Sequence, residues 1–162
     1  MDSTPPPVDG SAGQMVALDD LDRRIIAVLQ QDGRISMRAL AVRLHISRAN
    51  AYTRVERLER AGVIAGYTAI VDPIRFGYGL SAYVYLKIEQ QSWKAVRDRL
   101  LAMSEVDHAA LVSGDDDIVL LVRAADAAAL RDFVLTGLQQ IPQVLGTRTV
   151  LIFDESAPRR PR

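Results

Sequence analysis

The chain of 162 residues has no cysteine and only two histidines. Without cysteine, a disulfide framework, thiolate catalysis and a cysteine-ligated zinc site are excluded. His45 and His108 lie far apart in the sequence and make a poor metal site by themselves. We therefore expect no metal or other cofactor, with His45 in a turn and His108 on the surface of a sheet.

Long apolar runs are also missing. No uninterrupted run exceeds five residues, as in Ile118–Val122, whereas a membrane-spanning helix needs roughly 20. The first residues, MDSTPPPVDGSAGQ, have neither the basic start nor the apolar core of a signal peptide. With 49% hydrophobic and 25% charged residues, the chain has the composition of a globular protein. These features predict a soluble cytoplasmic protein that does not contact a membrane.

The net charge is zero, but basic and acidic residues are distributed unevenly. The segment 21–60 has nine basic and four acidic residues, whereas 79–155 has seven basic and eleven acidic ones. Such asymmetry indicates two domains with different partners, and the basic domain is the candidate for binding a polyanion.

Composition and periodicity divide the chain into five segments. Its two ends have few large apolar residues, so they cannot bury enough surface to offset the entropy lost on ordering. We expect a disordered arm at 1–17, a helical domain at 18–62, a connecting strand and linker at 63–78, a second domain at 79–155 and a disordered tail at 156–162.

Three helices are predicted in 18–62. Apolar residues recur at helical spacing from Leu21, after Ser36 and after Ser47. Asp19 or Asp20, Ser36 and Ser47 are of the residue types that cap helix N-termini. Only the three residues 45–47 separate the second and third helices, and three helices with such a tight turn form a helix-turn-helix unit.

The periodicity changes after this unit. The sequence VIAGYTAIVD (63–72) is rich in β-branched residues and predicts a strand, followed by a linker at 74–79. The remaining pattern is β-α-β-β-α-β, the ferredoxin-like order. The expected elements are a strand at 81–89, a helix at 93–103, strands at 108–113 and 118–123 joined by a turn at 114–117, a helix at 127–139 and a strand at 146–153.

This second domain predicts self-association. Tyr83 and Tyr85 alternate with aliphatic residues in its first strand, and the strand at 118–123 is apolar on both faces. Strands of that kind must be covered on both faces, but two helices cover only one face of a four-stranded sheet. A second subunit would bury the other face, so we expect an obligate dimer formed through this domain.

The third helix is the candidate for DNA contact. In a helix-turn-helix unit, the second helix of the pair lies in the major groove with its N-terminal residues near the base edges. Arginine suits guanine and phosphate, and asparagine suits adenine. The alternative is a solvated face on which Arg54 and Arg57 pair with Glu56 or Glu59. The three-helix context and the local basic charge favour DNA.

The sequence VSGDDDIVLLVRAAD offers a second site with three interpretations. The aspartates can form an exposed acidic turn, or they can bind a hard cation. They can also bind a small amine, with Asp115 or Asp117 accepting from the ammonium of an amino acid while the backbone at Gly114 donates to its carboxylate. Thr147 and Thr149 could supply hydroxyls to such a pocket.

The order of these blocks resembles the Lrp/AsnC family, also called feast/famine transcription regulators. The blocks are LDDLDRRIIAVLQQDGR, VERLERAGVIAGYTAIVDP, VSGDDDIVLLVRAAD and GTRTVLIF, and together they span roughly 18–155. The resemblance implies a repressor or activator that dimerises through its C-terminal domain. In this family dimers often assemble into octameric rings, and amino acids bind between dimers.

The resemblance also implies site positions. The family's ligand loop matches Leu111, Gly114 and Asp117, and its final-strand pocket matches Thr149 and 150–152. The uncharged residue that many members have between the two aspartates is Asp116 here, which adds negative charge beside the pocket and could favour a basic ligand or none. No operator sequence follows, because Arg48, Asn50 and Tyr52 are individual to this chain.

We therefore expect an α+β protein, with an N-terminal winged helix-turn-helix domain and a C-terminal ferredoxin-like βαββαβ (RAM-type) domain. It would be a regulator, not an enzyme, with double-stranded DNA, an amino-acid-like effector and further copies of itself as partners. The alternatives are a DNA-organising protein without an effector and, less favoured, a decarboxylase of similar architecture. The expected DNA contacts are Ser47, Arg48, Asn50, Ala51, Tyr52, Arg54 and Arg57. The expected effector contacts are Leu111, Gly114, Asp115, Asp117, Thr147, Thr149, Val150 and Leu151.

Overall fold

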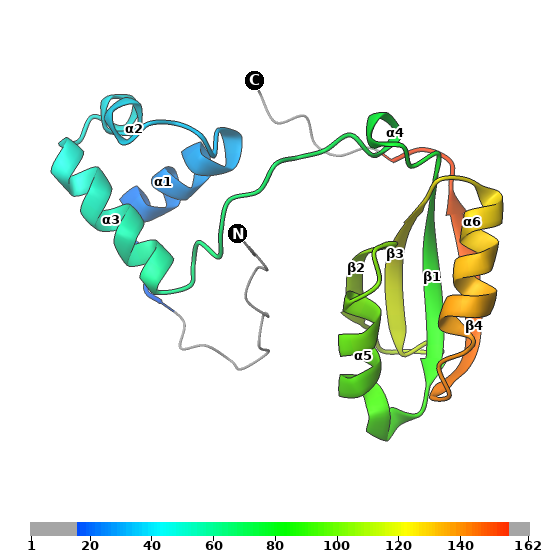
Figure 1. The fold of residues 1–162 in the computed structure, drawn as a ribbon. Helices are drawn as coiled ribbons and strands as arrows, with labels where there is room; N and C mark the ends of the chain where they lie inside the picture. Colours follow the sequence, from blue (N-terminus) through cyan, green and yellow to red (C-terminus); the bar gives the residue numbers. More distant parts are fainter. Residues whose placement is uncertain (1–15, 156–162) are drawn as a thin grey trace. The chain divides into compact units, whose positions relative to one another are not determined.

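The computed structural model describes residues 16–155, so 1–15 of the predicted arm and the predicted tail at 156–162 lie outside the described residues. The chain divides into two compact units, with the boundary between Ala69 and Ile70. Figure 1 shows helices alone in the first unit and a sheet with helices in the second. No described helix is long and apolar enough to cross a membrane.

The first unit contains the three predicted helices: α1 (Asp20–Gln31), α2 (Met37–Leu44) and α3 (Arg48–Arg60). Each contributes the apolar stripe that its periodicity predicts, and the three stripes meet in one core. The buried residues of this core are Ile25, Val28, Leu29, Leu40, Ala41, Leu44, Ala51, Val55 and Leu58.

The predicted caps position the helices. Asp19 begins α1 with a capping box, Ser36 Oγ accepts from the backbone of α2 at 3.1 Å, and Ser47 Oγ accepts from the backbone of α3 at 3.2 Å. His45 has a left-handed backbone (φ 56°) in the turn between α2 and α3. A single left-handed residue turns the chain sharply, which sets the two helices of the helix-turn-helix unit against each other.

Two predictions for the connecting segment are wrong. Residues 63–72 form no strand, and the first residues of the linker expected at 74–79 belong to the short helix α4 (Pro73–Phe76). A strand needs the hydrogen bonds of a neighbouring strand, and within the described chain this β-branched segment has no strand beside it. In α4, Pro73 occupies the first turn and Asp72 Oδ1 caps it, accepting from Arg75 N–H at 3.1 Å.

The second unit is an antiparallel four-stranded sheet in the order β2-β3-β1-β4, with two main helices. This order confirms the predicted ferredoxin-like domain. The helix expected at 127–139 is α-helical first and then widens into a π-helical turn. The elements are β1 (Leu80–Ile88), η1 (Gln90–Ser92), α5 (Trp93–Leu101), β2 (Val106–Leu111), β3 (Ile118–Ala124), α6 (Ala127–Asp132), η2 (Phe133–Leu138) and β4 (Val144–Ile152).

The helices α5 and α6 lie on one face of the sheet (Figure 1). Alternate residues of β1 and β3 enter the core on that face, including Val84, Leu86 and Leu120. The opposite face, which we call the open face, has Tyr83 paired in register with Val150 and Leu121. Tyr83 is 41% exposed and Val150 is 42% exposed, so this face keeps the apolar surface that the sequence predicts for a subunit contact.

Candidate DNA-binding and ligand-binding sites

Most of the predicted DNA contacts of α3 are exposed, but one of them lies in the core. Ala51, Val55 and Leu58 face the core, and Ala51 is fully buried. The prediction that Ala51 contacts DNA is therefore wrong, because its side chain lies on the inner stripe. The positions opposite that stripe are Ala49 and Thr53, which are exposed. Sequence reasoning missed both, although a period of 3.6 residues places them there.

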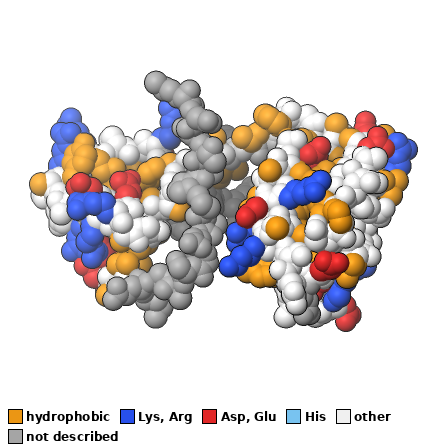
Figure 2. Space-filling view, turned by 60° about the horizontal axis from the view of Figure 1, so that its bottom comes forward, with side chains coloured by type: hydrophobic (Ala, Val, Ile, Leu, Met, Phe, Trp, Pro, Cys, Tyr) orange, Lys and Arg blue, Asp and Glu red, His pale blue; other side chains and the backbone are white. Residues whose placement is uncertain are grey.

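One flank of α3 presents a cation on an aromatic ring. The Arg48 guanidinium lies 5.4 Å from the centroid of Tyr52, and its Nη2 donates to the Tyr52 hydroxyl at 3.5 Å. Both side chains are exposed and lie in the first two turns of the helix, after the Ser47 cap. Figure 2 shows basic side chains on the visible surface of this unit, as a polyanion partner requires.

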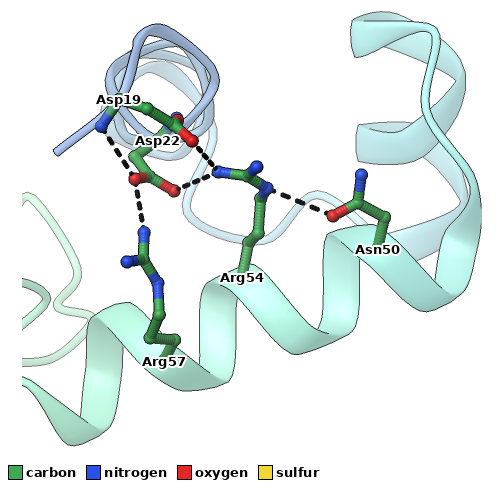
Figure 3. Close-up of polar contacts among 5 residues, drawn as sticks. All are labelled: Asp19, Asp22, Asn50, Arg54 and Arg57. Carbon is green, nitrogen blue, oxygen red and sulfur yellow. Dashed lines mark hydrogen bonds and ion pairs between the residues drawn. The ribbon is translucent and has the colours of Figure 1, made fainter.

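The other flank is occupied by ion pairs to α1 (Figure 3). Arg54 Nη1 lies 2.6 Å from Asp19 Oδ2 and 2.8 Å from Asp22 Oδ1, and Arg54 Nε donates to Asn50 Oδ1 at 3.1 Å. Arg57 pairs with the other oxygen of Asp22. Neither arginine pairs with Glu56 or Glu59, the partners considered in the solvated alternative.

Asp22 is fully buried, yet its carboxylate is charged at neutral pH. Burial raises the pKa of Asp22, but hydrogen bonds from Arg57, the backbone of Asp19 and Arg54 outweigh that effect and lower the pKa from 3.8 to about 2. A buried charge is tolerable only when it is paired and its lone pairs are used. The two arginines therefore stabilise the helical unit by pairing with the buried Asp22 carboxylate.

In the second unit, the turn between β2 and β3 borders a pocket of about 410 Å³. Arg148 of β4 crosses this pocket, with Nη2 lying 2.5 Å from Asp116 Oδ2 and its guanidinium 4.0 Å from the ring centroid of Tyr85. The hydrogen bond to Asp116 raises the pKa of Arg148 above its ordinary value. The pocket is lined by Tyr85, Val112, Ser113, Asp115, Asp116 and Arg148.

The charge of this pocket differs from the expectation. The sequence indicates an acidic site with Asp116 as surplus negative charge, whereas Arg148 neutralises Asp116. Sequence reasoning missed Tyr85 and Arg148 as pocket residues. Their strand positions pair in register, Tyr85 with Arg148, so both face the same side of the sheet. That pairing depends on strand order, which local periodicity does not contain.

The turn brings together only some of the predicted effector contacts. Asp115 lines the pocket, and Gly114 lies beside it with φ 130°, a conformation that L side chains rarely adopt. Asp117 is engaged elsewhere: its Oδ2 accepts from the Ile88 N–H at 2.9 Å and its Oδ1 lies 3.5 Å from Lys87 Nζ. Asp117 therefore fastens the turn to the end of β1.

The final-strand positions divide between the two faces of the sheet. Thr147, Thr149 and Leu151 pair in register with inward residues of β1, so they face the helices, and Thr147 Oγ1 accepts from Gln139 at 3.1 Å. Val150 belongs to the open face, and Leu111 is exposed at the end of β2. None of these five lines the pocket.

The described residues contain no group of three or more histidine, aspartate or glutamate side chains placed to hold a metal ion. Two of the three carboxylates in the turn, those of Asp116 and Asp117, are engaged by protein donors, which disfavours the hard-cation interpretation. Asp116 binds Arg148, Asp117 binds the end of β1, and the Asp115 backbone carbonyl accepts from Lys87 at 2.9 Å.

Comparison with known proteins assigns both parts of the chain to known domain families. Residues 18–65 match the family model described as winged helix-turn-helix DNA-binding, and 81–161 match the Lrp/AsnC ligand binding domain. The chain is 34% identical over 151 residues to the leucine-responsive regulatory protein of Serratia marcescens, covering 91% of this chain and 92% of that protein. It is 36% identical over 140 residues to the transcriptional regulator AldR of Mycolicibacterium smegmatis, covering 85% and 82%.

Solved structures agree with this assignment. A Neisseria meningitidis transcriptional regulator in complex with L-methionine matches with a TM-score of 0.82 and 26% identity, covering 88% of this chain and 94% of that one. These relatives are named as transcription regulators, not as enzymes. The chain therefore belongs to the Lrp/AsnC family, as a helix-turn-helix transcription regulator with a ligand-binding domain.

Proposed function

We propose that this regulator responds to a free amino acid, bound in the pocket between the β2–β3 turn and β4. The observation that carries the proposal is the placement of opposite charges in one pocket. Asp115 and Asp116 provide carboxylates, and Arg148 provides a guanidinium, within a space of about 410 Å³. An α-amino acid has both an ammonium and a carboxylate, so it can bind both kinds of group.

The binding step follows from the existing ion pair. Arg148 binds a ligand carboxylate through its planar fork of N–H donors, and the aspartates accept hydrogen bonds from the ammonium. The ligand then either bridges Asp116 and Arg148 or takes the place of their ion pair. Because this pair joins the β2–β3 turn to β4, ligand binding changes the contact between the two. The ring of Tyr85 and the side chain of Val112 provide apolar surface for the ligand side chain. The methionine complex of the Neisseria protein supports an amino acid as the ligand class.

The response reaches DNA through self-association. We propose a dimer formed through the open face around Tyr83 and Val150, with further assembly of dimers into a ring such as an octamer. Two helix-turn-helix heads on one assembly must meet DNA half-sites about one turn, roughly 34 Å, apart. A ligand that binds one arrangement of subunits better than another shifts the population of head spacings.

The test measures binding of the protein to DNA upstream of its own gene by fluorescence anisotropy, with and without pooled amino acids. We expect tight, salt-sensitive binding that changes with one pool. Arg148→Gln should abolish that change while DNA binding persists. Arg131→Gln is the matched control, because Arg131 pairs with Asp132 outside the pocket.

A full response in the Arg148→Gln variant would overturn the pocket assignment. A wild-type protein that binds DNA but ignores every amino acid would overturn the effector proposal and favour the DNA-organising alternative. Binding no tighter than to unrelated duplexes would contradict recognition of this upstream sequence.

A further inference from the structure

Asp22 is the one charged side chain that is fully buried in the described chain. Both of its carboxylate oxygens have partners among the described residues. Its Oδ1 binds Arg54 at 2.8 Å, and its Oδ2 binds Arg57 and accepts from the Asp19 N–H at 3.0 Å. One carboxylate in the first turn of α1 thus holds two arginines of α3 that lie about one helical turn apart (Figure 3).

Such a contact constrains α3 more closely than apolar packing does. Two hydrogen-bonded attachments on one helix fix both its rotation about its own axis and its position along that axis. Apolar contact between α1 and α3 is non-directional and tolerates small rotations. A rotation of α3 would leave a buried carboxylate short of a partner, which is strongly unfavourable.

Arg54 extends this constraint to the outer surface of α3. Its Nε donates to Asn50 Oδ1 at 3.1 Å. A guanidinium has only donors, so the Asn50 atom that faces it must be the oxygen. The Asn50 amide nitrogen then points away from Arg54, with its N–H groups available to acceptors such as guanine O6 and N7 or thymine O4.

We propose that Asp22 is a positioning residue for DNA recognition, which holds α3 in the rotation needed for base contact and, through Arg54, orients Asn50. Arg54 and Arg57 act in this clamp and not as phosphate contacts. The proposal rests on one part of the proposed function, namely that α3 enters the major groove of DNA. It reassigns two residues that the sequence predicts as DNA contacts, because Arg54 Nε and Nη1 and Arg57 Nη2 already donate to Asn50, Asp19 and Asp22 inside the helical unit.

The experiment selects preferred duplexes from a randomised DNA library with the full-length wild-type chain. It then compares affinities for the selected duplex and for a scrambled one, over a series of salt concentrations. We expect Asp22→Asn to lower the ratio of these affinities about tenfold, as expected for loss of one good base contact. The ratio corrects for any unfolded fraction, since unfolding lowers both affinities equally. Asp32→Asn is the matched control, because the exposed Asp32 side chain accepts only from the Arg34 backbone nearby.

Arg54→Lys separates the clamp from a phosphate contact. Lysine keeps the charge and serves phosphate well, but one ammonium does not reproduce the fork that holds Asp22 and Asn50 together. We expect this variant to lose its base preference at the base pair that Asn50 contacts. Asn50→Ala should lose its preference at the same base pair. The slope of log affinity against log salt should stay at the wild-type value in both.

Wild-type preference in Arg54→Lys, together with a slope that falls by about one in Arg54→Ala, would overturn the clamp and restore the phosphate contact. A wild-type protein that selects no sequence would overturn the proposal and sequence-specific binding together. The two failures are distinguishable, because the second appears without any substitution.

Discussion

The buried Asp22 carboxylate makes the stability of the helical unit depend on pH. Its pKa is about 2 in the folded chain, against 3.8 ordinarily. A folded pKa below the unfolded one adds stability above about pH 4, and that stability is lost as pH falls toward 2. We expect the free energy of unfolding of the wild type to fall more steeply than that of Asp22→Asn in this range.

Urea unfolding followed by circular dichroism, at pH 5, 4, 3 and 2, measures the difference between the two chains. Asp19 and Glu155 also have lowered pKa values, through Arg54 and Arg123 respectively, and both remain in the variant. Parallel pH dependence in the two chains would contradict the role given to Asp22.

Arg48 is the residue of α3 that we expect to contact a DNA phosphate. Its exposed guanidinium has only Tyr52 as a described side-chain partner. Arg48→Ala should weaken binding to all DNA sequences and make the slope of log affinity against log salt shallower by about one. Arg97→Ala, which removes a similar arginine beside Trp93 in the second unit, is the control. An unchanged slope in Arg48→Ala would remove it from the phosphate contacts.

At the scale of elements, the start of α3 depends on the Ser47 cap. Ser47 Oγ accepts from the Asn50 N–H at 3.2 Å, which satisfies one of the free donors at the helix N-terminus. Ser47→Ala should lower the free energy of unfolding of the helical unit by about 1 kcal/mol. Ser92 precedes α5 without any side-chain cap bond, so Ser92→Ala should change stability little. Equal effects of the two substitutions, measured by urea unfolding, would contradict the cap.

The elements themselves were largely predictable from local sequence. The apolar stripes around Ile25, Leu40 and Leu58 and the alternation in β1 both depend on residues close in the chain, and the structure confirms them. The strand expected at 63–72 failed for a non-local reason. High β-propensity makes a segment suitable for a strand, but only a neighbouring strand completes one.

At the scale of the whole molecule, we expect a dimer because the open face of the sheet exposes apolar side chains. Val150→Asp would place a carboxylate in the proposed subunit contact, opposite Tyr83. An unpaired buried charge costs about 3 kcal/mol, so the dimer dissociation constant should rise roughly a hundredfold. Analytical ultracentrifugation measures the shift. Leu101→Asp is the control, because Leu101 at the end of α5 is an exposed apolar residue like Val150 but does not belong to the open face. Equal weakening of the dimer by both variants would argue against this face as the subunit contact.

The amino-acid sequence by itself determined the two-domain order, the helix-turn-helix unit, its caps and the ferredoxin-like domain. Each of these depends on spacing, capping or periodicity within a few residues. Tertiary structure decided which charges meet. Arg54 and Asp22 are 32 residues apart, as are Arg148 and Asp116, and neither pair is visible in local patterns. The first pair turns two expected DNA contacts into internal supports, and the second turns an acidic loop into a pocket of both signs. Ion pairs depend on distance in space, and only the packing of helices and the register of strands set that distance.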